Sequence, residues 1–153
     1  LKGLGTVKGA TVVAVRFEQK ITPWLYVDAE AEMRVGGNNR GNRYRLGSEV
    51  LLVDNPTNKV SWDANIHAGD SRYNQTYFGV TTDQSASSTF KPFKGDGGIY
   101  AYSTAINWEH GFDDHWSSFT SLELTQYADQ AGASPLVKER TGAVASTSII
   151  YTF

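Results

Sequence analysis

The chain has 153 residues, a formal net charge of −2 and no cysteine, but it contains eight Tyr, seven Phe and four Trp. The near-neutral charge argues against a nucleic acid as partner, and the lack of cysteine excludes a disulfide framework and a thiolate metal site. No run approaches the roughly 18 apolar residues that a membrane-spanning helix needs.

The first half of the chain predicts strands with one apolar and one polar face. At residues 8–19, Val13, Val15 and Phe17 alternate with Arg16 and Glu18. Residues 24–35 give the clearest pattern, and a weaker strand follows at 44–53. In the clearest strand one face is apolar (Leu25, Val27, Ala29, Ala31, Met33, Val35) and the other carries four charges (Tyr26, Asp28, Glu30, Glu32, Arg34). Four charges on one face do not fit a sandwich core, but they fit the hydrated lumen of a β-barrel.

The second half continues the same alternation. At residues 60–69, apolar side chains occupy every second position (Val60, Trp62, Ala64, Ile66, Ala68), between Ser61, Asp63, Asn65, His67 and Gly69. Weaker strands are predicted at 98–109, 116–127 and 141–153. The total is about seven strands of roughly 10 to 13 residues, which is long enough to cross a membrane at a tilt.

The connections alternate in length, as they do in outer-membrane barrels. Counted back from a periplasmic C-terminus, the predicted outer loops are long or rich in Gly, Asn and Ser (36–43, 70–97, 128–140). The predicted periplasmic turns are short (19–23, 54–59, 110–115). This alternation favours a transmembrane barrel over a soluble sheet.

Aromatic residues cluster beside the predicted periplasmic turns. Trp24, Trp62, Trp108 and Trp116 all lie there, and the last strand ends in Tyr151-Thr152-Phe153. We therefore expect these four Trp, with Tyr151 and Phe153, to form an interfacial aromatic girdle. The terminal Phe153 is also expected to contact the barrel-assembly machinery.

An odd number of strands is unusual, because bacterial barrels have an even number. The first strand would also start on the outer side. We therefore expect the chain to be the C-terminal part of a longer barrel; the alternative is an unrecognised strand within 70–97. The chain starts at Leu1 without a signal peptide, so we expect a processed or truncated start.

A motif lies in the longest predicted loop. Residues 77–80 read Tyr-Phe-Gly-Val, after Asn74 and Gln75, and Gln84-Ser85-Ala86 follow. This combination resembles the MipA/OmpV family, whose hallmark is a Tyr-Phe-Gly-Val segment followed by Gln-Ser-Ala. Further matches are Asp114-His115-Trp116, Ser134-Pro135-Leu136-Val137 and Phe153. The motif residues are therefore candidate functional residues: Asn74, Gln75, Tyr77, Phe78, Gly79, Val80, Gln84, Ser85 and Ala86.

The resemblance implies an integral outer-membrane barrel of a Gram-negative bacterium, and complete family members are longer than this chain. It also implies a scaffold that links a murein-degrading lytic transglycosylase to a penicillin-binding synthase; other members are treated as porins or adhesins. The family has no agreed catalytic residues, so we expect neither enzymatic activity nor a cofactor.

Charged residues dominate the predicted lumen. By alternation it receives Arg16, Glu18, Asp28, Glu30, Glu32, Arg34, Arg45, Glu49, Asp63, His67, Glu109 and Glu123. The excess of carboxylates favours a narrow, cation-selective pore. The alternative is a plug of salt-bridged side chains, in which Arg16 pairs diagonally with Asp28, and Glu32 with Arg45.

His67 is the one candidate general base. Catalysis would need a nucleophile within reach, and Ser61 and Ser71 are the nearest hydroxyls in sequence. No nucleophile motif is evident, so the sequence favours a hydrogen-bonded lumen histidine. The three scattered histidines do not form a metal-binding pattern.

The predicted outer side carries aromatic and basic residues. Aromatic residues of the long loop (Tyr77, Phe78, Phe90, Phe93) could contact a ligand or a cell surface. Alternatively, the loop folds inward and narrows the pore, or packs on itself. A basic fringe could bind lipopolysaccharide phosphates, or it could be ordinary solvated charge. It consists of Arg40, Arg43, Arg72, Lys91, Lys94, Lys138 and Arg140.

Together these patterns predict an all-β protein whose residues 1–153 form one antiparallel transmembrane barrel domain in the bacterial outer membrane. It would contact lipid and lipopolysaccharide there. The resemblance implies a scaffold for murein-synthesising and murein-degrading enzymes, and the acidic lumen gives the alternative, a cation-favouring porin.

Overall fold

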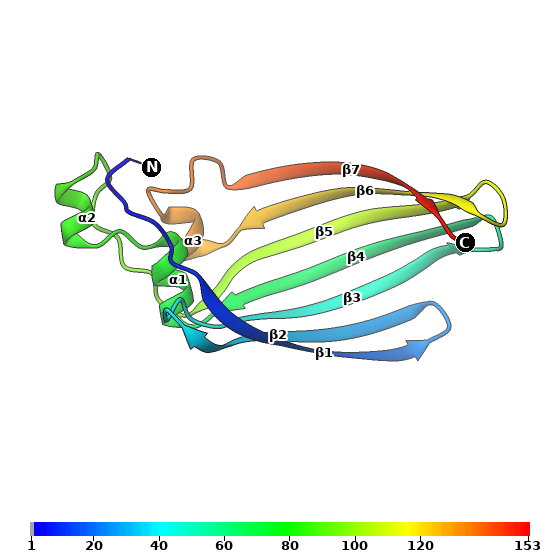
Figure 1. The fold of residues 1–153 in the computed structure, drawn as a ribbon, viewed down its shortest axis with the longest axis horizontal. Helices are drawn as coiled ribbons and strands as arrows, with labels where there is room; N and C mark the ends of the chain where they lie inside the picture. The colour runs from blue at the N-terminus through cyan, green and yellow to red at the C-terminus, as the bar shows by residue number, and fades with distance from the viewer. Residues whose placement is uncertain (1) are drawn as a thin grey trace.

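The computed structural model describes residues 2–153, which form one antiparallel sheet with three short helices (Figure 1). All seven predicted strands are confirmed, and they pair in chain order. Their bounds are β1 (Ala10–Thr22), β2 (Leu25–Gly37), β3 (Arg43–Asp54), β4 (Asn58–Gly69), β5 (Gly98–Gly111), β6 (Trp116–Tyr127) and β7 (Thr141–Tyr151). The sheet is open, since β1 and β7 do not pair with each other.

The long connection between β4 and β5 does not contain a further strand, so that alternative is wrong. It holds α1 (Ser71–Phe78) and α2 (Thr82–Ala86), followed by a single bridge between Val80 and Phe93. The third helix, α3 (Asp129–Ala133), lies between β6 and β7. None of the helices within residues 2–153 is long and apolar enough to cross a membrane.

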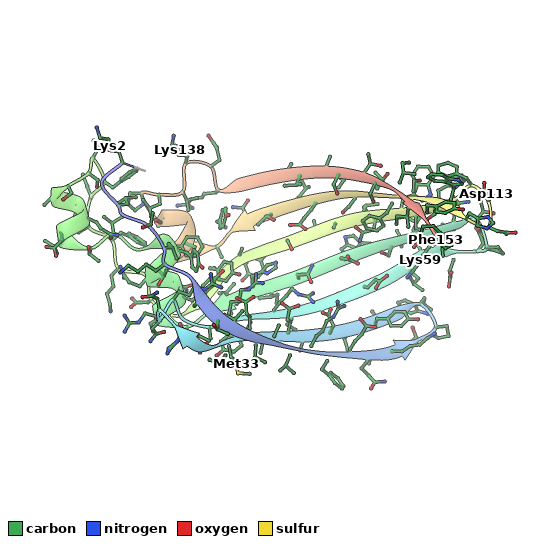
Figure 2. All side chains as sticks on the ribbon, viewed as in Figure 1. Lys2, Met33, Lys59, Asp113, Lys138 and Phe153 are labelled. Atoms are coloured by element: carbon green, nitrogen blue, oxygen red, sulfur yellow. The ribbon has the colours of Figure 1, made fainter. Side chains whose placement is uncertain are left out.

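The two ends of the sheet differ in construction (Figure 1). One end, the helical end, carries the three helices and the N-terminal segment. The other, the hairpin end, carries the three short turns and the C-terminus. Figure 2 shows Lys2 and Lys138 at the helical end, and Lys59, Asp113 and Phe153 at the hairpin end. The chain therefore places its long connections on one side and its short ones on the other.

The register gives the sheet one polar and one apolar face. A polar row runs across it from Arg16 through Glu30 and Arg45 to His67, and an apolar row runs beside it from Val15 through Ala31 and Tyr44 to Ala68. Successive side chains in a strand point to opposite faces, so these rows define the polar face and the apolar face.

The apolar face is the exposed one. Phe17, Leu46 and Ile149 are 63%, 58% and 63% exposed, whereas Asp28 on the polar face is only 8% exposed. The main buried apolar cluster lies at the helical end, where Phe78 and Ala131 pack on Tyr100 and Ala101. The distribution over the strands is thus opposite to that of a water-soluble sheet.

Candidate functional site

Asp28 is the centre of an ion-pair network on the polar face. Its carboxylate accepts a hydrogen bond from Arg45 and lies 3.5 Å from Nε of Arg16. Arg45 also donates from Nη1 to Oδ1 of Asn65 at 2.6 Å. Gly47 leaves the space for this network, because a Cβ there would lie 2.4 Å from Oδ2 of Asp28. The Arg16–Asp28 pair expected from the sequence is present.

The network continues toward the helical end along β2 and β3. Arg45 lies 3.7 Å from Glu30, and Arg43 lies 2.8 Å from Glu32; Arg40 approaches Glu32 at 3.8 Å. The expected Glu32–Arg45 pair is wrong, because the register sets Arg45 opposite Glu30 and Arg43 opposite Glu32. Arg43 was missed as a member of this face, although it lies two residues before Arg45.

The remaining carboxylates of the polar face are less well paired. Glu18 bonds to Arg16 at 2.8 Å, and Glu49 lies 3.7 Å from Lys59. Asp63 accepts from Asn107 Nδ2 at 2.7 Å, but its Oδ1 is buried without a hydrogen-bond partner among the described residues. Within residues 2–153, Glu109, Glu123 and Arg34 make no ion pair. The acidic excess predicted for this face is therefore only partly neutralised.

His67 contacts a serine that the sequence did not indicate. Its Nε2 lies 2.9 Å from Oγ of Ser103 on β5, so the partner is neither Ser61 nor Ser71. Ser103 also accepts from Asn65 at 3.5 Å. No carboxylate hydrogen-bonds to the His67 ring among the described residues, so the pair lacks the third group that orients a catalytic histidine.

The loop at residues 70–97 folds onto the polar face. Phe78 of α1 packs on Tyr100 and Tyr127, with ring centroids 5.5 and 5.9 Å apart, and Tyr73 stacks on Tyr100 at 5.4 Å. Burial, followed by the neighbouring Tyr100, raises the pKa of Tyr73 above its usual value. These aromatic side chains of α1 therefore pack against β5 and β6 on the polar face. We call α1, α3 and this aromatic cluster the cap.

Several motif residues hold the cap together through hydrogen bonds. Asn74 donates from Nδ2 to the Asp96 carbonyl at 2.7 Å, and Oε1 of Gln75 accepts from the Gly95 amide at 2.9 Å. Ser134, in the second matching segment, donates to the Phe78 carbonyl at 2.6 Å. Position 95 has no room for a side chain, since a Cβ there would lie 2.4 Å from the Asn74 carbonyl oxygen. These contacts fix the positions where the loop leaves and rejoins the sheet.

The other motif residues are local. Gln84 and Thr81 form a capping box at the start of α2, and Val80 pairs with Phe93. Tyr77 packs on Tyr73 with centroids 4.5 Å apart. The remaining members are Gly79, which is the helix C-cap residue of α1, and Ser85 and Ala86, which lie in α2.

Asp70 and Asn42 were not among the site residues predicted from the sequence. Their hydrogen bonds join the β2–β3 connection to the β4–β5 connection. The Asp70 carboxylate accepts from the Tyr73 amide at 2.7 Å and from the Asn42 amide at 2.9 Å, and the Asn42 side chain accepts from the Arg34 amide at 2.8 Å. The aspartate before α1 and the Thr81-x-x-Gln84 spacing are both helix-start signals visible in the sequence.

The aromatic residues predicted for a girdle lie toward the hairpin end. Tyr151 packs on Trp116 with centroids 4.8 Å apart and on Phe153 at 5.1 Å. Trp108 donates to Asn58 at 3.0 Å and Trp62 donates to Thr104 at 2.7 Å. Trp24 is exposed in the β1–β2 turn. The set is therefore gathered near one end of the sheet.

The basic fringe divides into distinct environments. Arg43 belongs to the ion-pair network, and Arg140 donates from Nε to the Gly132 carbonyl at 2.9 Å. Lys94 pairs with Asp96 at 2.8 Å, and this hydrogen bond raises the pKa of Lys94. Arg40 and Arg72 line a cavity at the helical end.

Comparison with known proteins identifies one family. The family model described as MltA-interacting protein MipA matches residues 2–153, which is essentially the whole chain. No curated protein and no solved structure matches the chain. The family match agrees with the resemblance carried by Tyr77-Phe78-Gly79-Val80 and Gln84-Ser85-Ala86. The chain belongs to the MipA, or MltA-interacting protein, family.

Proposed function

We propose that the sheet is part of an integral outer-membrane barrel, with the apolar face toward lipid and the polar face toward a lumen. The observation that carries this proposal is the inverted burial: Phe17 and Leu46 are exposed, while Asp28 is buried among arginines. Such a surface is unstable in water but suits the hydrocarbon region of a bilayer. The Trp residues near the hairpin end then belong to an interfacial girdle.

In this proposal the hairpin end faces the periplasm and the helical end faces outward. The support is the length asymmetry, because outer-membrane barrels have short periplasmic turns and longer outer loops. The exposed Phe153 at the hairpin end is then available to the assembly machinery during insertion.

The periplasmic function we propose is a scaffold for murein enzymes. The family model is described as an MltA-interacting protein, and we extend this to the chain as binding of a lytic transglycosylase through the hairpin end. A penicillin-binding synthase is the second proposed partner. The hairpin end offers exposed acidic and aromatic groups in its turns, among them Asp113, Asp114 and Phe112.

The scaffold proposal is tested by retention of the transglycosylase on the folded, detergent-solubilised protein. Replacing turns 54–59 and 110–115 together by Gly/Asn/Ser sequences of equal length should reduce the retained enzyme at least tenfold, on the order of 1.4 kcal/mol. The matched control replaces residues 82–88 at the helical end and should leave retention unchanged. Equal retention by both variants would mean that the turns are not the docking surface.

A second function, a narrow cation-favouring pore, is supported by three carboxylates that have no ion-pair partner among residues 2–153, Asp63, Glu109 and Glu123. Planar-bilayer recordings of Glu109→Gln/Glu123→Gln should then show a lower preference for cations. Glu30→Lys/Glu32→Lys also changes the charge but breaks the ion pairs with Arg43 and Arg45. A silent membrane with correctly folded protein would favour the scaffold.

We do not propose an enzyme. His67 and Ser103 are in contact at 2.9 Å, but a hydroxyl nucleophile is normally activated by a base that a third group orients. A hydrogen-bonded histidine on a polar barrel wall needs no such group.

A further inference from the structure

A cavity of about 510 Å³ lies at the helical end, bounded by the N-terminal segment 4–8, by residues 38–40 and by one side of α1. Arg72, Gln75 and Thr76 face it and lie at helical spacing, so they share one side of α1. Phe78 and Tyr73, on another side, pack in the cap. The helix thus lies between the aromatic cluster and the cavity, and Tyr77 contacts both.

The cavity is basic. Lys8, Arg40 and Arg72 line it, and none of the lining residues that the structure describes is acidic. Arg40 approaches Glu32 at 3.8 Å, whereas Lys8 and Arg72 make no ion pair in the part of the chain that the structure describes. The polar-face cavity between β1 and β4 is the opposite, because four carboxylates and two arginines line it. An anion is therefore favoured at the helical end and disfavoured deeper along the sheet.

The wall formed by the N-terminal segment is held at both ends. Nε2 of Gln84 donates to the Leu4 carbonyl at 2.7 Å, and Asn38 donates from its side chain to the Gly9 carbonyl at 3.2 Å. Gly3 has a φ of +89°, and a Cβ there would lie 1.9 Å from the Ser87 carbonyl oxygen. The segment is thus fastened to the α2 region before it crosses the cavity. A ligand would not have to order this wall on binding.

The lining combines three kinds of group. The guanidinium groups of Arg40 and Arg72 suit phosphate, which they can bind in a bidentate manner. Leu4, Val7 and the ring of Tyr77 provide an apolar wall, and Asn39 and Thr6 provide polar groups for hydroxyls. The volume falls within the range of small-molecule sites. A phosphate with an attached sugar ring matches all three kinds of group.

We propose that this cavity binds a phosphorylated saccharide, which is either a free sugar phosphate or the phosphorylated sugar headgroup of an outer-leaflet lipid. The assignment rests on Lys8, Arg40 and Arg72 around a cavity whose described lining has no carboxylate, and on the N-terminal wall, which is held at both ends. It is independent of the proposed periplasmic partner, which binds at the other end of the sheet.

Two binding measurements on the folded protein distinguish the two sources. Glucose 1-phosphate is titrated by calorimetry into protein in phosphatidylcholine nanodiscs, and lipid A is added to detergent-solubilised protein and its retention measured by native mass spectrometry. Binding of glucose 1-phosphate identifies a free solute as a ligand, and binding of lipid A alone identifies the lipid. If the wild-type protein binds neither probe, the proposal is overturned.

The decisive comparison is between two variants of equal charge. Lys8→Gln/Arg72→Gln removes two cavity charges, and Lys91→Gln/Lys138→Gln removes two charges of the same end that do not line the cavity. The first variant should weaken binding of whichever probe the wild-type protein binds, glucose 1-phosphate or lipid A, at least tenfold. The second variant should weaken it less than twofold. Equal losses, or no loss in the first variant, would overturn the proposal. Heat-dependent gel mobility checks folding, and retained transglycosylase binding shows that the periplasmic end is intact.

Discussion

The cap and the sheet use apolar residues in opposite ways. In the cap, Phe78 and Tyr100 are each 9% exposed and pack ring against ring, as in a water-soluble core. In the sheet, Phe17 and Leu46 are exposed on the apolar face, whereas Asp28 on the polar face is buried and ion-paired. The same chain is therefore built for two surroundings, and the boundary between them lies where β4, β5 and β6 reach the helices.

In the cap, apolar side chains bury one another, so their burial stabilises the cap without any further partner. The free energy that apolar residues contribute in the strands depends on what covers the apolar face, because no part of residues 2–153 covers it. Substitutions in the two regions should consequently respond differently to the same change of surroundings.

The largest effect is expected for Phe78→Ala in the cap. Removing this ring takes away one of the packing partners of Tyr100 and of Tyr127 and should lower the local stability by about 3–5 kcal/mol. Amide hydrogen exchange in nanodiscs should show faster exchange in α1 and at residues 98–101, with little change in β2. Phe78→Leu, the control, should keep most of the protection. Uniform acceleration across the sheet would contradict a separate cap core.

The second effect tests what covers the apolar face. Leu46 on β3 and Phe112 in a turn at the hairpin end are both 58% exposed. Leu46→Lys should destabilise the protein by about 2–4 kcal/mol if Leu46 meets lipid, whereas Phe112→Lys should stay within about 0.5 kcal/mol. Urea unfolding in lipid vesicles measures both. Equal, small effects would show that the apolar face is not embedded.

The third effect concerns the ion-pair network. In Gly47→Ala the added Cβ would lie 2.4 Å from Asp28 Oδ2 and 2.6 Å from Arg45 Nη1, so the network must shift at a loss of about 1–3 kcal/mol. Gly142 on β7 has open space around its Cβ position, so Gly142→Ala should be neutral or slightly stabilising. Equal unfolding midpoints for the two variants would mean that the network is loosely packed.

The smallest effect is a pH dependence confined to the cap. In the unfolded chain a tyrosine has a pKa of about 10. Because burial raises the pKa of Tyr73, the folded cap binds the Tyr73 proton more tightly than the unfolded chain does. The contribution of Tyr73 to the stability of the folded cap is therefore fully present below about pH 10 and is lost as the pH rises above that value. Exchange rates of α1 amides between pH 9 and 11, corrected for intrinsic exchange, should show this loss, and Tyr73→Phe should reduce it.

The strands could be predicted because alternation is a local signal that survives in each segment separately. Tyr26 to Arg34 set one face of β2 without reference to any neighbour, and the structure places them accordingly. Register is not local. The Arg45–Glu30 pair and the His67–Ser103 contact depend on how β3 and β5 align with their neighbours, and a connection of 28 residues separates β4 from β5. Those contacts could not be derived from one sequence.

The helical end was the least predictable region. Its three helices have eight, five and five residues, too short for a stable helix outside the protein, so their formation depends on tertiary packing. The sequence marked Asn74, Gln75 and Phe78 through a motif, but not their contacts. Only Asp70 and the Thr81–Gln84 spacing carried a physical signal for helix starts.

The strictly sequential strand order has a consequence for assembly. Within the described sheet, each strand pairs only with the strands next to it in the chain. The sheet can therefore add its strands in chain order. The helical end cannot form in this way. Its hydrogen bonds join Ser134 to Phe78, 56 positions apart, and Gln84 to Leu4, 80 positions apart. We therefore expect the helical end to close last, after the strands have found their register.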